Sequence, residues 1–322
     1  MRSRSICVLG GTGFVGSHLV ARMTRDGHRV RVLTRSRDRN RHLQVLPGVE
    51  LVEADVYDPA ALETAFRGCD TAVNLVGILN ERGYSGAGFE RAHAELTRKV
   101  LAAAHAAGVT RLLQMSSLQA GETAPSHYLR SKGRAEASIR AAGPGLQWTI
   151  LQPSVIFGPD DSFTNRFASL VRIFPFVPPA RAGARFAPVY IGDVVEAFAR
   201  ALGDRSTHGK TLQLYGPDVV TLAELVRYVA KVLGLGRLVV GLPDAIGWLQ
   251  AAALGCLPGK PLSLDNFRSL QLDSVGTIDG LAALGITPSS LRVVVPTYLG
   301  TTGREAQLDA YRRSAGSRDG EA

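Results

Sequence analysis

Tyr128 and Lys132 are four residues apart in a predicted helix, and this spacing places both side chains on one face of it. The predicted strand before that helix, residues 111–117, ends in Ser116 and Ser117. A tyrosine with an ordinary pKa of about 10 is a poor base at neutral pH, so a nearby ammonium group is needed to favour its phenolate. We therefore predict proton transfer by Tyr128, supported by Lys132, on a substrate oxygen that Ser117 holds, with Ser116 as the alternate serine.

A second candidate site lies in residues 6–20, which read as an apolar strand, a glycine turn and the start of a helix. Gly10 allows the tight turn, Gly13 lets the backbone approach a pyrophosphate, and Gly16 lets the helix pack closely on the strand. The free N–H groups and the dipole of the helix N-terminus favour phosphate. Because a second strand, residues 29–34, follows the helix, the pattern predicts a dinucleotide-binding βαβ unit.

The two sites together support hydride transfer coupled to proton transfer. Tyr128 would exchange a proton with the substrate as hydride moves to or from the nicotinamide, and Lys132 would also bond the nicotinamide ribose.

The residues after the second strand indicate which nucleotide is bound. A site that prefers NAD usually places an acidic residue here against the ribose 2′-hydroxyl, but this chain has Thr34 and Arg35, with Arg37 close by. Arginine pairs well with phosphate, so we predict NADP(H) in preference to NAD(H), with Arg35 and Arg37 on the 2′-phosphate. The alternative is that these arginines form a solvated basic loop.

The glycine spacing G-x-x-G-x-x-G resembles that of the extended and atypical short-chain dehydrogenase/reductases. Later motifs lie in residues 257–262, 265–266, 270–275, 284–288 and 296–300. Together these motifs resemble the atypical group that contains the nucleotide-binding accessory subunit of respiratory complex I and its bacterial relatives. This resemblance implies NADP(H) binding, a Rossmann-type sheet, and association with quinone-linked or membrane complexes.

The resemblance also assigns residues. The family uses a Ser, a Tyr and a Lys in the roles that we predict for Ser117, Tyr128 and Lys132, and its residues matching Asp55 and Val56 lie beside the adenine. The carboxyl ends of the later strands supply the remaining expected contacts. The predicted cofactor-binding residues are Gly10, Thr12, Gly13, Phe14, Val15, Gly16, Thr34, Arg35, Arg37, Asp55, Val56, Asn74, Leu75, Val76, Gly77, Ser116, Lys132, Pro153, Ser154 and Val155.

Three polar residues receive other interpretations. Gln152 stands where the family usually has arginine, which makes a standard nucleotide-sugar reaction less favoured. His93 lies on a predicted helix over residues 89–107, and we give it no catalytic role. Asp193 is predicted to cap a helix over residues 194–202.

These patterns predict an α/β fold: a doubly wound parallel sheet of the Rossmann type with a smaller C-terminal α/β lid region. Residues 1–159 are the expected dinucleotide-binding domain, to which residues 186–216 return. Residues 160–185 and 217–302 are expected to form the substrate or lid region, and residues 303–322 a disordered polar tail.

Residues 243–257 are apolar on nearly all sides over about four helical turns, which is too short to span a bilayer. Two interpretations are open. The segment is either an internal helix that caps the substrate cleft, or a helix that docks on a membrane surface or a partner.

Composition limits the cellular setting. The net charge of +9 favours anionic ligands or surfaces, but we find no RNA-binding motif and predict no nucleic-acid partner. Cys7, Cys69 and Cys256 are far apart and odd in number, which argues against disulfides or a cysteine-rich zinc site, and no metal site is predicted. Without a signal or spanning segment, we expect a cytoplasmic protein, or one attached peripherally to the inner face of the membrane.

Three functions fit these observations. The first is an NADP(H)-dependent oxidoreductase acting on a carbonyl, quinone-like or isoprenoid-like small molecule. The second is a non-catalytic, nucleotide-bound accessory or assembly protein of a respiratory complex, which Gln152 and residues 243–257 favour. The third is a sugar-nucleotide epimerase or dehydratase, which the fold allows and the C-terminal motifs disfavour.

Overall fold

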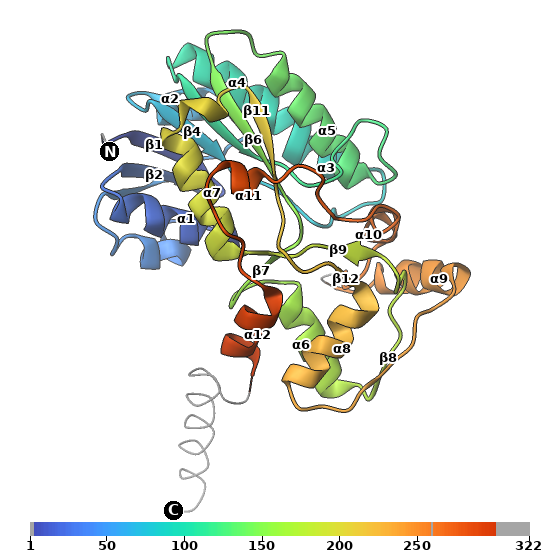
Figure 1. Ribbon diagram of the computed structural model, residues 1–322. Helices are drawn as coiled ribbons and strands as arrows, with labels where there is room; N and C mark the ends of the chain where they lie inside the picture. Colours follow the sequence, from blue (N-terminus) through green and yellow to red (C-terminus); the bar gives the residue numbers. More distant parts are fainter. Residues whose placement is uncertain (1–2, 259, 301–322) are drawn as a thin grey trace, which may run out of the picture.

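Seven parallel strands form the central sheet of the computed structural model, which describes residues 3–258 and 260–300 (Figure 1). The strand order is β11-β6-β5-β4-β1-β2-β3, so the chain builds outward from β1 to β3 and then crosses back to β4. The expected doubly wound parallel sheet is thereby confirmed. The strands are β1 (Ser5–Leu9), β2 (Arg29–Thr34), β3 (Val49–Glu53), β4 (Thr71–Asn74), β5 (Arg111–Met115), β6 (Gln147–Pro153) and β11 (Lys210–Leu214).

Helices cover both faces of this sheet (Figure 1). On one face, α1 (Phe14–Arg25) packs beside α7 (Ile191–Gly203). The other face carries α2 (Pro59–Phe66), α4 (Leu96–Ala106) and α5 (His127–Arg140). Each layer buries its own apolar cluster against the strands. A fully buried large apolar side chain contributes about 1.5–3 kcal/mol, so these two clusters hold the sheet and its carboxyl edge in place.

A smaller lobe lies below the sheet in Figure 1 and has its own apolar core. Three two-stranded pairs, β10 with β7, β12 with β9 and β13 with β8, build it together with helices. Its strands are β7 (Ile156–Phe157), β8 (Phe176–Val177), β9 (Arg185–Phe186), β10 (Val189–Tyr190), β12 (Val220–Thr221) and β13 (Leu238–Val239). Its helices are α6 (Thr164–Ile173), α8 (Leu222–Val232), α9 (Asp244–Leu254), α10 (Leu264–Ser269) and α12 (Leu291–Leu299). The remaining short helices are η1 (Asp38–Leu43), α3 (Ala87–Phe89), η2 (Glu90–Glu95), η3 (Arg205–Thr207) and α11 (Gly280–Ala283).

Two local expectations are corrected by the structure. The segment expected to be one helix over residues 89–107 is α3 followed by the π-helical turn η2 and then α4. Asp193 does not cap its helix, because α7 already begins at Ile191. The Asp193 carboxylate instead accepts hydrogen bonds from the backbone N–H and the hydroxyl of Ser289, at 2.7 and 3.0 Å, and so fastens α7 to the chain before α12.

The helix α9 lies on the outside of the lobe, so it is not internal as the first interpretation had it, while its capping of a substrate cleft stays a prediction. Only Gly247 and Ala251 of this helix are buried, while Trp248 is 52% exposed and Leu249 is 63% exposed. Within the described ranges, the structure contains no helix with the length and apolarity needed to cross a membrane. The predicted tail, residues 303–322, lies outside the described residues.

Candidate functional site: the carboxyl edge of the sheet

The glycine turn after β1 forms a cradle that side chains would fill. Gly10 has a φ of +75°, a backbone conformation that favours glycine. A Cβ atom on Gly16 would lie 2.6 Å from the Cα atom of Gly11 and even closer to the Gly10 carbonyl oxygen. Gly13 is the N-cap of α1, which has no side-chain cap and no acidic residue in its first turn. This helix N-terminus therefore fits the pyrophosphate of a dinucleotide, at the point where the strand order reverses.

The turn after β2 carries Arg35 and Arg37, whose side chains are exposed. Thr34 is buried, and its hydroxyl donates to the Ser36 carbonyl at 3.1 Å and accepts from the Asn40 side-chain amide at 3.0 Å. Arg35 and Arg37 are exposed on either side of Ser36. The geometry leaves both guanidinium groups free to meet a 2′-phosphate, and their contact with it stays a prediction.

Most of the other residues predicted to bind the cofactor lie at strand ends, but several of their side chains already have protein partners. Asn74 donates to the Gln114 side chain at 3.0 Å and accepts from the Val76 N–H at 3.1 Å. Ser154 donates to the Ser274 carbonyl at 2.8 Å. These side chains shape the loops, so backbone atoms and apolar surface are left to face a ligand. The remaining predicted residues lie at the start of α1 or after the ends of strands. Thr12, Phe14 and Val15 are at the start of α1, and Asp55 and Val56 follow β3. Leu75, Val76 and Gly77 follow β4, and Pro153 and Val155 are at the end of β6.

Ser116 differs from these residues, because its hydroxyl is buried at the end of β5 and has no hydrogen-bond partner among the described residues. A buried hydroxyl without a partner costs free energy. A bound cofactor would satisfy it, which again fits the predicted group.

The three predicted catalytic residues converge beyond β5. Tyr128 lies in the first turn of α5 and Lys132 lies one turn later on the same helix. Lys132 is 4% exposed, and its ammonium donates to the Met115 carbonyl at 3.3 Å. A Cβ atom on Gly77 would lie 3.3 Å from the same ammonium, so Lys132 also reaches the end of β4. Burial lowers the pKa of Lys132 to about 8, while the carboxylate of Glu136 acts in the opposite direction.

The electrostatics of Tyr128 differ from the expectation. Burial raises the pKa of the phenol, and a hydrogen bond with the Ser117 side chain is the opposing influence. The predicted lowering of this pKa by Lys132 is not found, and the Lys132 ammonium donates to the Met115 carbonyl. The phenol is therefore held protonated at neutral pH, and a protonated phenol serves as an acid rather than as a base.

His93, which received no role from the sequence, packs against Tyr128. Their ring centroids are 5.4 Å apart and the rings meet edge to face. The Ser131 hydroxyl donates to the Tyr128 carbonyl, so the His93 Nδ1 atom, 2.8 Å from that hydroxyl, is the donor to it. The His93 Nε2 atom accepts the Ile78 N–H at 3.2 Å. Both ring nitrogens are thus used by a neutral imidazole. Burial, and then the charge of Lys132, lower the pKa of His93 to about 2.

A buried carboxylate under Lys132 was also missed. Glu136 is one turn after Lys132 on α5 and is 2% exposed. Gln152 donates to Glu136 at 2.7 Å and Arg140 pairs with it at 2.7 Å. The Gln152 amide therefore binds this carboxylate rather than a ligand. No local spacing could have joined Gln152 to Glu136, because they meet only through the packing of α5 on β6.

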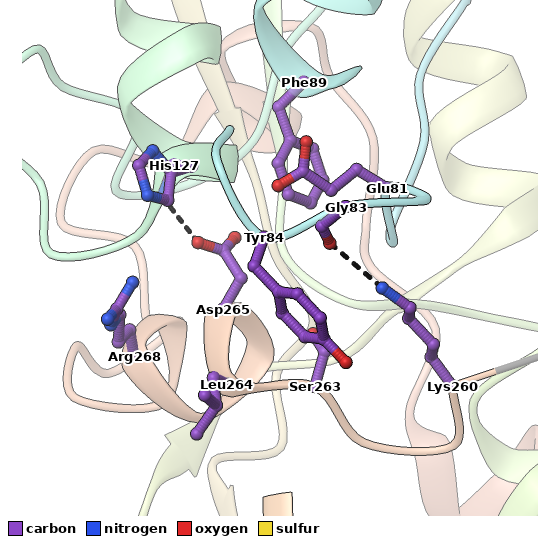
Figure 2. Close-up of a pocket in the computed structure, with 10 residues that line it drawn as sticks. All are labelled: Glu81, Gly83, Tyr84, Phe89, His127, Lys260, Ser263, Leu264, Asp265 and Arg268. Atoms are coloured by element: carbon purple, nitrogen blue, oxygen red, sulfur yellow. Dashed lines mark hydrogen bonds between the residues drawn. The ribbon is translucent and has the colours of Figure 1, made fainter. Parts of the chain in front are cut away.

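The lobe reaches the catalytic helix through Asp265, as Figure 2 shows. The Asp265 carboxylate accepts the backbone N–H groups of His127 and Tyr128, at 2.7 and 3.1 Å. A small cavity of about 60 Å³ lies beside it, between the loop that carries Tyr84 and the segment from Lys260 to Arg268. That volume holds one or two water molecules and no substrate. Across it, the Lys260 ammonium donates to the Gly83 carbonyl at 3.0 Å.

The described part of the chain contains no cluster of three or more His, Cys, Asp or Glu side chains arranged to hold a metal ion.

Comparison with known proteins agrees with this arrangement. Residues 10–168 match a family model described as NAD(P)H-binding. The chain is 32% identical over 280 residues to subunit 9 of the NADH dehydrogenase [ubiquinone] 1 alpha subcomplex of Arabidopsis thaliana mitochondria, covering 84% of this chain and 68% of that protein. It is also 32% identical over 310 residues to the ceramide reductase of Caulobacter vibrioides, covering 95% of this chain and 94% of that protein.

A solved structure of the NADPH-dependent quinone oxidoreductase of Escherichia coli, complexed with NADPH, has the same fold. It superposes with a TM-score of 0.71 at 22% identity, covering 89% of this chain and 97% of that one. The glycine cradle, the parallel sheet and these relatives lead to one conclusion: the chain belongs to the NAD(P)H-binding, atypical short-chain dehydrogenase/reductase family that includes the complex I subunit 9 proteins.

Proposed function

We propose that this protein is an NADP(H)-dependent oxidoreductase that reduces a carbonyl or quinone-like small molecule. The observation that carries the proposal is the convergence of Ser117, Tyr128 and Lys132, with the Tyr128 phenol held protonated by burial. A protonated phenol suits reduction, because the oxygen of the product needs a proton. The similarity to a protein named ceramide reductase supports the same class of reaction.

Each residue has a separate task in this reaction. When bound, the nicotinamide supplies the hydride that adds to the carbonyl carbon. The Ser117 hydroxyl donates a hydrogen bond to the carbonyl oxygen, which takes up the electron pair of the broken π bond. Tyr128 then transfers its phenolic proton to that oxygen and regains one from solvent. Lys132, one turn further along α5, would stabilise the phenolate that exists between these two events once its ammonium turns from the Met115 carbonyl.

We propose NADP(H) rather than NAD(H) because of Arg35 and Arg37. Both side chains are exposed after β2, and Thr34 replaces the carboxylate that would favour NAD. The remaining proposed cofactor contacts are the residues named above for the glycine cradle and the strand ends.

A second candidate function is that of a nucleotide-bound accessory protein of a respiratory complex. The observation that favours it is the similarity to the mitochondrial subunit 9 proteins. In that case the protein would sit at the inner face of a cytoplasmic membrane, in contact with a membrane complex. A sugar-nucleotide reaction is the least supported candidate, because Gln152 is already bound to Glu136.

The two leading candidate functions differ in whether the protein oxidises NADPH catalytically. The purified protein is denatured to identify any released nucleotide, and the native protein loaded with NADPH is mixed with quinones or a cell extract. An enzyme should oxidise NADPH, and Tyr128→Phe should abolish this while leaving NADPH affinity unchanged. Tyr298→Phe is the matched control, since it removes a phenol that contacts the Thr164 hydroxyl at 2.9 Å inside the lobe. Stoichiometric NADPH that stays reduced would instead favour the accessory function.

A further inference from the structure

The helix α9 buries small residues against the lobe and exposes large apolar ones. Its small residue Gly247 faces inward, where an added Cβ atom would lie 3.0 Å from the Ala180 Cβ atom and 3.1 Å from the Phe267 ring. Its large residues Ile246, Trp248 and Leu249 face outward and are 52, 52 and 63% exposed. A helix that is apolar on nearly all sides is ordinarily buried. The outer side of α9 therefore lacks a partner within the part of the chain that the structure describes.

The neighbouring strand pair extends this surface. Phe176 of β8 stands opposite Leu238 of β13, and both are exposed, whereas the next pair of residues points into the lobe. Phe174 is exposed just before β8. The Gln250 side chain of α9 donates to the Pro178 carbonyl directly after β8, at 2.9 Å, so the helix lies beside the end of this strand. We name this surface the apolar face: Phe174, Phe176, Leu238, Ile246, Trp248 and Leu249.

Basic residues outnumber acidic ones in the segments that carry the apolar face. Residues 164–184 and 222–262, which build this side of the lobe, contain seven Lys and Arg residues but only two acidic ones. Asp244 is paired with Arg181 at 3.1 Å, and Glu224 belongs to the capping box at the start of α8. Arg172 and Lys231 are exposed, and the Arg172 carbonyl accepts a hydrogen bond at 3.5 Å from Arg237, the residue before β13. An excess of cations beside exposed aromatic and aliphatic side chains is the combination that binds anionic bilayer surfaces.

We propose that the apolar face is a docking surface for an anionic lipid bilayer. Trp248, Leu249 and Phe176 enter the interfacial region, where tryptophan in particular is stabilised, and the surrounding arginines and lysines contact the headgroups. The helix lies in the plane of the membrane and does not cross it. The proposal concerns attachment only and holds whether or not the protein turns over a substrate.

The first test is flotation of the full-length protein with vesicles of phosphatidylcholine, with and without phosphatidylglycerol. We expect flotation with the anionic vesicles and its loss at high salt. Trp248→Ser with Leu249→Ser should lower the partition coefficient more than about tenfold. Ile278→Ser with Val293→Ser is the matched control, because those side chains are 69 and 71% exposed elsewhere on the molecule.

Charge is tested in the same assay. Arg172→Glu with Lys231→Glu should weaken binding more than about tenfold, since each cation near such a surface contributes about 1 kcal/mol. Arg25→Glu with Arg205→Glu changes the net charge equally at exposed sites outside the lobe and should have a smaller effect.

The second test leaves α9 intact. The chain has two tryptophans, so Trp148→Phe makes Trp248 the single reporter. Its emission should shift to the blue when anionic vesicles are added and be quenched by brominated lipid. Absence of flotation overturns the proposal, as does flotation with unchanged Trp248 emission, which would place the contact elsewhere. Flotation that is equal with neutral vesicles overturns the part of the proposal that assigns anionic lipid.

Discussion

Asp265 accepts the first two backbone N–H groups of α5, the helix that carries Tyr128 and whose N-cap residue is Ser126. The Asp265 carboxylate accepts the Tyr128 N–H at 3.1 Å, although the two residues are 137 positions apart in the sequence. A second tie runs from the Ser269 hydroxyl to the Ser126 hydroxyl, at 2.8 Å. Both of these lobe residues belong to α10, so the position of Tyr128 depends on a segment outside the nucleotide-binding sheet.

Asp265→Ala is therefore expected to impair stability and turnover together. Removing the carboxylate leaves two N–H groups of α5 without an acceptor, which should cost about 1–2 kcal/mol of unfolding free energy. Because Tyr128 is in the same turn, kcat should fall at least about tenfold while NADPH affinity changes little. Urea unfolding and steady-state kinetics measure the two effects.

Asp58→Ala provides the comparison, because Asp58 caps α2 through the Ala60 N–H at 3.0 Å on a helix without predicted catalytic residues. It should lose similar stability and keep its kcat. Equal kcat losses in the two variants would show that Asp265 does not position Tyr128.

The sequence predicted local features well, and the reason is physical. The tight turn predicted at Gly10 has the positive φ that favours glycine, and the residues that signal it are adjacent in the chain. The strand over residues 29–34 likewise agrees with the structure. The spacing of Tyr128 and Lys132 is also local, so a helix alone brings them to one side.

Long-range contacts were not predictable in this way. The hydrogen bonds of Asp265 to α5, the tautomer of His93 and the bond from Gln152 to Glu136 depend on how distant segments pack. The orientation of α9 was also undetermined, because an apolar pattern on all sides does not say which side is buried.

Gly16→Ala should remove nucleotide binding and destabilise the protein. The new Cβ atom would lie 2.6 Å from the Gly11 Cα atom, and backbone there cannot move aside without opening the cradle. We expect a loss of about 2–3 kcal/mol in unfolding free energy. Gly145→Ala is the control, since a Cβ atom at Gly145 meets nothing within 4 Å. If the two variants are equally stable and bind NADPH equally, the close packing at Gly16 is not needed.

Arg35→Ala should weaken NADPH binding about tenfold or more and leave NADH binding unchanged, because only NADPH carries the 2′-phosphate. Fluorescence titration of both nucleotides gives the dissociation constants. Arg39→Ala removes an exposed arginine of η1, just after this turn, and should change neither constant. Equal affinities of the unmodified protein for NADPH and NADH would contradict the proposed preference.

The neutral imidazole of His93 predicts a loss of stability in acid. The folded protein holds the pKa of His93 at about 2, whereas the unfolded chain has the ordinary value of about 6.5. Below pH 6.5 the unfolded state therefore binds a proton that the folded state does not. The free energy of unfolding consequently decreases as the pH is lowered from about 6.5 toward 2. At pH 4.5, two units below the pKa of the unfolded chain, this loss amounts to about 3 kcal/mol of unfolding free energy.

The variant His93→Gln tests this expectation. It keeps an acceptor for the Ile78 N–H but does not titrate, so its unfolding free energy should fall less steeply between pH 6.5 and 4.5. The exposed His105 gives the control variant His105→Gln, which leaves His93 in place and should keep the steep fall. Parallel curves for the unmodified protein and His93→Gln would mean that His93 takes up its proton in the folded state.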